Sequence, residues 1–205
     1  MAIYLVRHAK DDESFRGGWS QKGLINEGIQ QATKLREYLH KNQKHFQIDR
    51  IISSDLTRAR ETAANIVESL PLPVEHAEEW REMNNGDLAG ISNIEAGEKY
   101  PGLYFKSLRM DERYPGGESP IEFFNRIKQA FTETCEEQLE KNYKENVLIV
   151  THGGVINIIY HLLNEKEWTN KNKSFPIFYT SIHQLEYIND QWEVTQENVK
   201  EHLSS

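Results

Sequence analysis

Two short apolar runs, each followed closely by a histidine, constrain the fold of this chain more than any other feature. Ala2–Val6 (AIYLV) is followed by Arg7 and His8, and Val147–Val150 (VLIV) is followed, after one threonine, by His152. A continuous apolar run of this length is typical of a strand that is covered on both faces. We therefore expect a sheet buried between layers of helices, with polar side chains where its strands end.

Segments with helical periodicity alternate with these runs. Gly28–His40 and Leu56–Leu70 have apolar residues at helical spacing, and another helix is expected to begin near Val155. Ile48–Ile52 is a further strand candidate, and the residues after it, Ser53–Asp55, are of the types that cap helix N-termini. This alternation predicts parallel strands joined by helices.

The second half of the chain adds a long helix and a hairpin. Ser119, Pro120 and Glu122 predict the start of the helix, because they suit the N-cap, the first helical position and the partner in a capping box. Its expected apolar face consists of Ile121, Phe124, Ile127, Phe131, Cys135 and Leu139. Ser181–Tyr187 and Gln191–Val194 flank an Asn-Asp pair, which predicts two strands joined by a tight turn.

Together these elements predict a three-layer α/β fold with a doubly wound, mainly parallel sheet and helices on both faces. The length of 205 residues fits a single domain over residues 1–205. The stretch from about 91 to 117 is irregular and rich in aromatic and charged residues, and we expect it to form an inserted cap segment. Ligands bind beyond the carboxyl ends of the strands in such sheets, which is where Arg7 and His8 lie.

Composition excludes several classes of protein. The net charge of −8 argues against a general binder of nucleic acid or of a membrane surface, although an acidic protein can hold a local cationic pocket. No apolar run approaches the ~20 residues of a membrane span, and the N-terminus lacks the features of a signal peptide. Cys135 is the only cysteine, so we expect no disulfide and no cysteine-based metal site. We expect a cytoplasmic protein that is a monomer or a homodimer.

Polar residues occur at four places where such a sheet would hold a site: Arg7–His8, Ser53–Asp55 with Arg58, Thr151–Gly154, and Arg81–Glu82. Arginine forks match phosphate oxygens, and a helix N-terminus adds unpaired N–H groups and a positive dipole end. A neutral imidazole can attack phosphorus, and a protonated glutamic acid can give a proton to the departing alkoxide. These groups suffice for phosphoryl transfer to a histidine without a metal ion.

Six sequence blocks, spread over most of the chain, resemble the histidine phosphatase superfamily, which is also called phosphoglycerate-mutase-like. In chain order they are LVRHA, GWSQKGLINEGIQQATKL, SSDLTRARETA, WREMNNGDLAG, PGGES and VLIVTHGGVI. An Arg-His pair alone is common in proteins, but six blocks in the family's order are far more specific.

The resemblance implies a role for each candidate residue. His8 is the expected nucleophile, which forms a phosphohistidine, and Glu82 is the expected general acid and then general base. Arg7 and Arg58 are expected to bind the phosphoryl oxygens, while His152 completes the phosphate site and stabilises the transition state. The resemblance implies a phosphatase that needs no metal ion and no cofactor, with a small phosphorylated metabolite or inorganic phosphate as its ligand.

Some residues have a simpler interpretation. Glu82 lies in a charged run of a kind that is usually solvated, and Arg60 is interpreted as an ordinary surface charge. Glu118 and Ser119 are interpreted as structural, and Cys135 as a core residue. The other histidines, His40, His45, His76, His161, His183 and His202, are interpreted as surface or core residues.

The chain departs from the family's pattern at Ala9, Lys10, Gln21, Gly23, Ile25 and Ala89, and these positions bear on the substrate rather than on the reaction. The cations of the expected cap, Lys99, Lys106, Arg109 and Arg113, are candidates to bind a second anionic group. The alternatives are a mutase of the phosphoglycerate type, a non-catalytic phosphate-binding module and a metal hydrolase. The sequence has no HExxH motif or zinc-type ligand set for the last of these.

Overall fold

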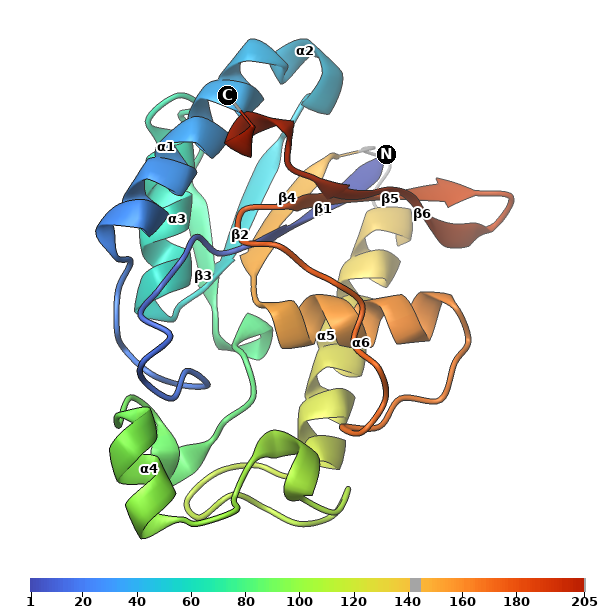
Figure 1. Ribbon diagram of the computed structural model, residues 1–205. Helices are drawn as coiled ribbons and strands as arrows, with labels where there is room; N and C mark the ends of the chain where they lie inside the picture. The colour runs from blue at the N-terminus through green and yellow to red at the C-terminus, as the bar shows by residue number, and fades with distance from the viewer. Residues whose placement is uncertain (141–144, 205) are drawn as a thin grey trace.

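The computed structural model describes residues 1–140 and 145–204, and its centre is a six-stranded sheet with the order β3-β2-β4-β1-β5-β6 (Figure 1). The strands are β1 (Ala2–Arg7), β2 (Arg50–Ser54), β3 (Val74–Ala77), β4 (Val147–Thr151), β5 (Ile182–Ile188) and β6 (Gln191–Val199). The first four strands in the sheet order are parallel to one another, whereas β5 pairs antiparallel with β1 and with β6. The predicted α/β fold with a mainly parallel sheet is therefore confirmed.

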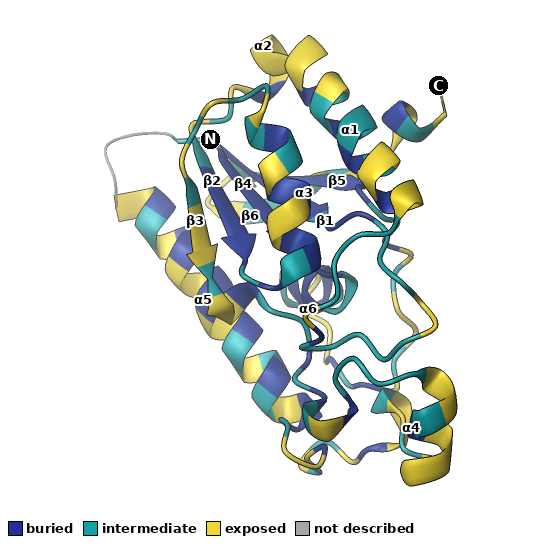
Figure 2. Cartoon of the chain, turned by 90° about the vertical axis from the view of Figure 1, so that its left-hand side faces the viewer, coloured by how far each residue is buried: buried dark blue, intermediate teal, exposed yellow. Residues whose placement is uncertain are grey.

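Helices cover both faces of the sheet, as Figures 1 and 2 show. The α-helices are α1 (Asn26–Lys41), α2 (Gln43–Phe46), α3 (Thr57–Val67), α4 (Asn93–Lys99), α5 (Pro120–Glu140) and α6 (Gly153–Leu163). Short 3-10 helices span Glu78–Trp80, Gly86–Leu88, Phe105–Ser107 and Glu201–Leu203. The helices α1 and α3 pack on one face of the sheet, and α5 and α6 pack on the other. In the described part of the chain, no helix combines the length and the apolar character that crossing a bilayer requires.

The strands face two separate hydrophobic cores. Ile3 and Leu5 of β1 pack in the core under α5 and α6, whereas Tyr4 and Val6 pack in the core under α1 and α3. All four side chains are buried, and burial of an aliphatic side chain contributes roughly 1.5–3 kcal/mol. Burial on both faces explains why β1 is a continuous apolar run rather than an alternating one.

Parallel pairing brings the carboxyl ends of three strands to one edge of the sheet. β1 lies beside β4 with Arg7 opposite Thr151, and the backbone N–H of His8 donates to the Thr151 carbonyl at 2.8 Å. β2 lies on the other side of β4, with Ser53 opposite Val150. The polar residues that follow β1, β2 and β4 therefore meet at this edge, as the sequence predicted.

The start of α3 differs from the prediction, because none of the residues Ser53–Asp55 caps this helix. The N-cap position is Leu56, which makes no side-chain capping bond. The hydroxyl of Ser54 instead lies 2.8 Å from Nε2 of His152, which directly follows the neighbouring strand β4. A residue type that is typical of a cap is thus used in a tertiary contact.

The buried face of α5 agrees with the expected one at Ile127, Phe131 and Cys135, which are buried, and differs from it toward both ends of the helix. Phe123 is buried, whereas Ile121 and Leu139, which were expected to be buried, are 38% and 47% exposed. Phe123 and Phe124 are adjacent, so the apolar pattern fits more than one helical phase. Both rings contact Trp168, and Phe124 stacks on it with 5.5 Å between ring centroids.

One strand has no clear signal in the sequence. β3 is only four residues long and pairs on one side with β2, at the edge of the sheet. Glu75 and His76 in its middle are exposed, so it lacks the apolar run that marks the central strands.

Two local predictions are confirmed. The N–H of Ser119 donates to Oε2 of Glu122 at 2.8 Å, and the N–H of Glu122 donates to the Ser119 hydroxyl at 3.3 Å, which is the expected capping box. Asn189 and Asp190, between β5 and β6, have φ values of 49° and 65°. This left-handed pair is typical of a tight hairpin turn.

A glycine in α1 fixes the loop that follows β1. A Cβ added at Gly28 would lie 2.0 Å from the carbonyl oxygen of Lys10. Gly28→Ala is therefore expected to lower the free energy of unfolding by about 1–3 kcal/mol, because the methyl group meets backbone that cannot yield. Urea denaturation measures the change.

Gly97→Ala is the matched control, because Gly97 is inside α4 and a Cβ there meets nothing within 4 Å. Alanine is generally more favourable than glycine inside a helix by roughly 0.5–1 kcal/mol, so this variant is expected to be as stable as the original or more so. Equal effects of the two substitutions would contradict the close packing of α1 on the loop.

Candidate active site

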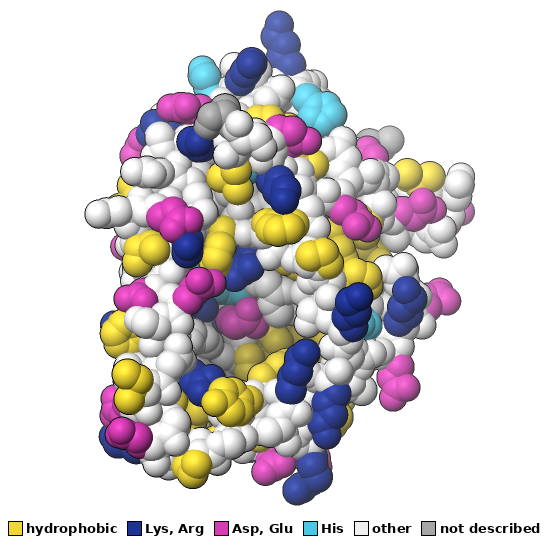
Figure 3. Space-filling model, in the orientation of Figure 1, with side chains coloured by type: hydrophobic (Ala, Val, Ile, Leu, Met, Phe, Trp, Pro, Cys, Tyr) yellow, Lys and Arg dark blue, Asp and Glu magenta, His cyan; other side chains and the backbone are white. Residues whose placement is uncertain are grey.

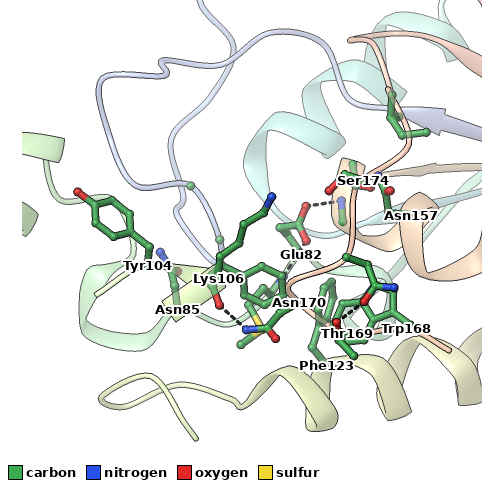
Figure 4. Close-up of a pocket in the computed structure, with 18 of the residues that line it drawn as sticks. Glu82, Asn85, Tyr104, Lys106, Phe123, Asn157, Trp168, Thr169, Asn170 and Ser174 are labelled. Atoms are coloured by element: carbon green, nitrogen blue, oxygen red, sulfur yellow. Dashed lines mark hydrogen bonds between the residues drawn. The ribbon is translucent and has the colours of Figure 1, made fainter. Parts of the chain in front are cut away.

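A cavity of about 1040 Å³ lies at the edge of the sheet where β1, β2 and β4 end. Figure 3 shows the hollow, with an acidic side chain inside it and Lys and Arg side chains at its edges. Arg7, His8 and Glu82 line the cavity, together with the first two residues of α6. Residues from the segments 16–18, 104–107 and 168–175 line much of the rest (Figure 4). The cavity therefore joins the strand ends to part of the expected cap.

Two hydrogen bonds fix the tautomer of the His8 ring. Nδ1 lies 2.7 Å from the carbonyl oxygen of Ala9, which can only accept, so Nδ1 carries the proton. Nε of Arg58 donates to Nε2 of His8 at 3.2 Å, so Nε2 holds a lone pair. A neutral imidazole with this lone pair is the form that can act as a nucleophile.

The surroundings of His8 keep its ring neutral. The side chain is buried, and burial lowers its pKa well below the ordinary value of 6.5. The positive charges of Arg58 and Arg7 lower the pKa further, whereas the hydrogen bond to Ala9 acts in the opposite direction. At neutral pH, His8 is therefore unprotonated at Nε2.

Arg7 is held at the cavity by the segment before β5. Its Nη1 donates to the carbonyl of Ile177 at 2.7 Å, and its guanidinium carbon lies 3.7 Å from the centre of the Tyr179 ring. Nε of Arg7 is buried and has no hydrogen-bond partner among the described residues. A buried N–H without a partner is costly, so this atom is ready to bind an oxyanion in the cavity.

Arg58 is fixed by the loop that follows β1. Its Nη1 donates to Ser20 O at 3.1 Å and its Nη2 donates to Gly18 O at 2.8 Å. Asp11 is its acidic partner, with 3.6 Å between Nε and Oδ2. Burial lowers the pKa of Arg58 and Asp11 opposes this effect, and the guanidinium stays charged at neutral pH. Its charge therefore adds to that of Arg7 beside His8.

The carboxylate of Glu82 is positioned by backbone N–H groups. Oε2 accepts from the N–H of Gly154 at 2.9 Å, at the start of α6, and Oε1 accepts from the N–H of Met83 at 3.0 Å. A Cβ at Gly154 would lie 2.2 Å from Oε1, so only glycine lets the carboxylate approach this closely. Figure 4 shows Glu82 among the residues that line the cavity.

His152 lies beside His8 but does not line the cavity. The two ring centroids are 5.0 Å apart, and Nε2 of His152 is 2.8 Å from the hydroxyl of Ser54. The side chain is fully buried, and burial lowers its pKa well below 6.5, assisted by the charge of Arg58. Its Nδ1 is buried without a hydrogen-bond partner in the part of the chain that the structure describes.

The structure brings the five sequence-predicted site residues together, in two groups. Arg7, His8 and Glu82 line the cavity, whereas Arg58 and His152 are buried next to His8. The roles expected for these residues stay predictions, because the geometry gives their positions and not their chemistry.

Several residues that position the site were not among the predicted site residues. Nε1 of Trp19 donates to the backbone carbonyl of Glu82 at 2.8 Å, and Nη2 of Arg126 donates to the same carbonyl at 3.1 Å. Glu118 accepts from Arg126 at 2.7 Å, which agrees with its interpretation as a structural residue. The Tyr179 ring under Arg7 was also not anticipated. Each of these contacts joins segments far apart in the sequence.

Only one of the four cap cations proposed to bind a second anion lines the cavity, and it is Lys106. Lys99 pairs with Glu95 one turn away on α4. Arg109 pairs with Asp111 in the same segment, and Arg113 pairs with Glu122 in the first turn of α5. The expectation for these three residues was wrong, because they do not line the cavity and each is paired with a carboxylate of the chain itself.

The described residues include no group of three or more His, Cys, Asp or Glu side chains placed to hold a metal ion.

Comparison with known proteins gives a consistent relationship. The sequence profile described as the histidine phosphatase superfamily (branch 1) matches residues 3–200. A protein named metal-independent phosphoserine phosphatase, from Arabidopsis thaliana, is 30% identical over 93% of this chain and 80% of its own length. A protein named uncharacterized phosphatase PhoE, from Bacillus subtilis (strain 168), is 30% identical over 99% of this chain and 97% of its own.

A solved structure agrees with these matches. It is a mycobacterial glucosyl-3-phosphoglycerate phosphatase in complex with VO3, with a TM-score of 0.76 and 25% identity over 96% of this chain and 98% of its own.

The lowered pKa of His8 gives a testable expectation. At pH 7, ¹⁵N NMR of the histidine side chains is expected to show His8 protonated at Nδ1 only, with a protonation midpoint well below 6.5. Arg58→Met is expected to raise the midpoint, because it removes a positive charge beside the ring. Arg60→Met, an exposed neighbour on α3, is the control and is expected to leave it unchanged. A proton on Nε2 of His8 at pH 7 would contradict the assignment.

Proposed function

The chain belongs to the histidine phosphatase superfamily, branch 1, and on this premise we propose that it is a metal-independent phosphatase that hydrolyses a phosphomonoester through a phosphohistidine. The observation that carries the proposal is the neutral His8 at the cavity, whose Nε2 holds a lone pair and lies close to Arg7 and Arg58. An oxyanion placed there would meet a nucleophile and two cations together. The related mycobacterial phosphatase was solved in complex with VO3, which supports an oxyanion as a ligand of this chain.

Substrate binding would itself free the nucleophile. Nε of Arg58 donates to Nε2 of His8, which occupies the lone pair. A phosphoryl oxygen is a stronger acceptor for a guanidinium N–H than an imidazole nitrogen is, because the bond is charge-assisted on both sides. Arg58 would therefore turn to the phosphate, while the unpartnered Nε of Arg7 binds another oxygen.

In the first step, Nε2 of His8 forms a bond to phosphorus while the bond from phosphorus to the alcohol oxygen breaks. Glu82 enters this step protonated and gives its proton to the departing oxygen, so that a neutral alcohol leaves. The His8 ring gains positive charge, and its Nδ1–H bond to the Ala9 carbonyl becomes charge-assisted. The positive charge of Arg58 acts on the oxygens of the transferring group.

In the second step, a water molecule attacks phosphorus and the bond to Nε2 of His8 breaks. The carboxylate of Glu82 takes a proton from this water and returns to its starting form. Inorganic phosphate leaves, and His8 recovers its lone pair. His152, 5.0 Å from His8 with an unpartnered Nδ1, is proposed to stabilise the negative charge of the transition state by donating a hydrogen bond from Nδ1, which carries the proton of the neutral ring when Nε2 accepts from the Ser54 hydroxyl.

Removal of the nucleophile tests the proposal most directly. Hydrolysis of p-nitrophenyl phosphate is measured in excess EDTA for the wild type, His8→Ala and a control, His40→Ala, whose side chain is exposed at the end of α1. The wild type and the control are expected to be active, whereas His8→Ala is expected to lose at least about 10³-fold in kcat/KM, because no covalent intermediate forms.

Loss of wild-type activity in EDTA, or activity that survives in His8→Ala, would overturn this mechanism. No hydrolysis by the wild type, together with labelling of His8 by a bisphosphorylated donor, would favour a phosphoglycerate-type mutase. No hydrolysis and no labelling would favour a phosphate-binding module.

Glu82→Gln tests the proposed acid. The loss in kcat/KM is expected to be larger for an alkyl phosphate than for p-nitrophenyl phosphate, because p-nitrophenolate leaves without protonation. The wild-type kcat/KM is expected to peak on the acid side or to be bell-shaped, because Glu82 must start protonated. His8 stays neutral well below pH 6.5 and permits this acidic optimum. Equal losses for both substrates, or a rate that rises steadily to about pH 9, would contradict the role of Glu82.

A further inference from the structure

The charges that line the cavity are opposite in sign to those of the chain as a whole. The chain carries a net charge of −8. The described cavity lining nevertheless contains Arg7, Arg16, Lys106 and Lys173, with Glu82 as its acidic side chain. Since Arg7 faces the proposed phosphate position, the other three cations exceed what one phosphate needs.

These three cations also differ from the other cations near the site in their partners. Arg81 binds Asp55 and Arg126 binds Glu118, both through short ion pairs. Over residues 1–140 and 145–204, by contrast, Arg16, Lys106 and Lys173 have no carboxylate within 4.0 Å. Cationic side chains without an internal counter-ion, placed around a cavity, are suited to an anionic ligand.

Arg16 is the most constrained of the three. Its guanidinium carbon lies 4.6 Å from the centre of the Tyr104 ring, and its Nε is buried without a hydrogen-bond partner among the described atoms. Its charge lowers the pKa of Tyr114, although burial has the larger effect and raises that pKa to about 12. Arg16 therefore lies close to two tyrosines that both line the cavity.

The backbone around Arg16 is also fixed. Its N–H donates to the Ile91 carbonyl at 2.8 Å, and its own carbonyl accepts from the N–H of Gly90 at 2.8 Å. A side chain held on such a segment loses little freedom when it binds a ligand, which favours binding.

Arg16 is close along the chain to the proposed phosphate site. The carbonyl of Gly18 accepts from Arg58, which in turn donates to His8. Gly18 is the second residue after Arg16, so their Cα atoms are at most about 7 Å apart. One small molecule can therefore reach from His8 to Arg16.

Several aromatic residues line the same cavity. The aromatic residues that line the cavity are Tyr104, Phe105, Tyr114, Phe123, Trp168 and Phe175. Asn170 joins two wall segments, because its Nδ2 donates to Phe105 O at 2.6 Å and to Leu108 O at 3.0 Å (Figure 4). The space is thus enclosed by an apolar surface that suits the carbon skeleton of an alcohol.

We propose that Arg16, with Lys106 as another cation that lines the same cavity, forms a second anion-binding subsite, and that the substrates are phosphomonoesters whose alcohol carries a carboxylate or a second phosphate. The inference rests on the proposed phosphatase function for the reaction itself. Arg16 is a specificity-determining residue in this assignment, since it contacts the far end of the substrate and not the transferred phosphoryl group.

The test compares 4-carboxyphenyl phosphate with 4-carbamoylphenyl phosphate, which has the same shape without the second charge. The wild type is expected to prefer the carboxylate by about 10- to 100-fold in kcat/KM, as for one charge-assisted hydrogen bond. Arg16→Gln is expected to abolish this preference mainly through KM, and Lys106→Gln to reduce it. Phenylene 1,4-bisphosphate shows whether a second phosphate is preferred to a carboxylate.

Arg109→Gln is the matched control, because Arg109 belongs to the same cap segment as Lys106, has a side chain that is 73% exposed and does not line the cavity. It is expected to keep the preference of the wild type. Hydrolysis of both compounds at equal efficiency by the wild type would refute the subsite and leave the phosphatase function intact.

The subsite can also be tested without turnover. Calorimetry is expected to show that 4-carboxybenzyl phosphonate, which cannot be hydrolysed, binds the wild type about 10- to 100-fold more tightly than Arg16→Gln. The carbamoyl analogue is expected to bind the two proteins alike, and equal binding of the carboxylate to both would refute the subsite. Failure of hydrolysis with this binding difference intact would refute the phosphatase function alone.

Discussion

The placement of two arginines, one buried and one partly buried, beside a neutral histidine is the constraint on which the site depends. Arg58 is 2% exposed and lies against His8, and Arg7 adds a second charge at the cavity. Such cations are costly to bury unless their N–H groups find acceptors. The fold supplies those acceptors mainly as backbone carbonyls, at Gly18, Ser20 and Ile177, with one carboxylate at 3.6 Å from Arg58. Carbonyls hold the guanidinium groups without neutralising them, so positive charge remains for an oxyanion.

The same arrangement explains why the loops around the sheet are held so firmly. The loop after β1 bonds to Arg58, and Gly28 of α1 packs against the carbonyl of Lys10 within it. The segment before β5 bonds to Arg7, and α6 begins at an N–H that binds Glu82. Each connection that orders a loop also places one reacting group, so stability and site geometry depend on the same contacts.

Much of this could be predicted from the sequence, for identifiable reasons. The apolar run of β1 with His8 after it, and that of β4 with His152 after it, indicated two buried parallel strands, and parallel strands must bring their carboxyl ends together. The capping box at Ser119 and the turn at Asn189 are local signals that need no tertiary contact. By contrast, Ser54 looked like a helix cap and binds His152 instead, because a hydroxyl can serve either purpose.

The sequence by itself determined the central parallel strands, the layers of helices and the identity of the residues at the strand ends, since periodicity and burial on both faces are encoded locally. Only the tertiary structure decided which residues share the cavity. It placed Lys106 at the cavity and Lys99 in an ion pair outside it. It also placed Arg16 over the Tyr104 ring, and it brought Trp19 and Arg126 to the backbone carbonyl of Glu82. These contacts join segments distant in sequence, and a charge or a ring carries no local mark of the partner that folding brings to it.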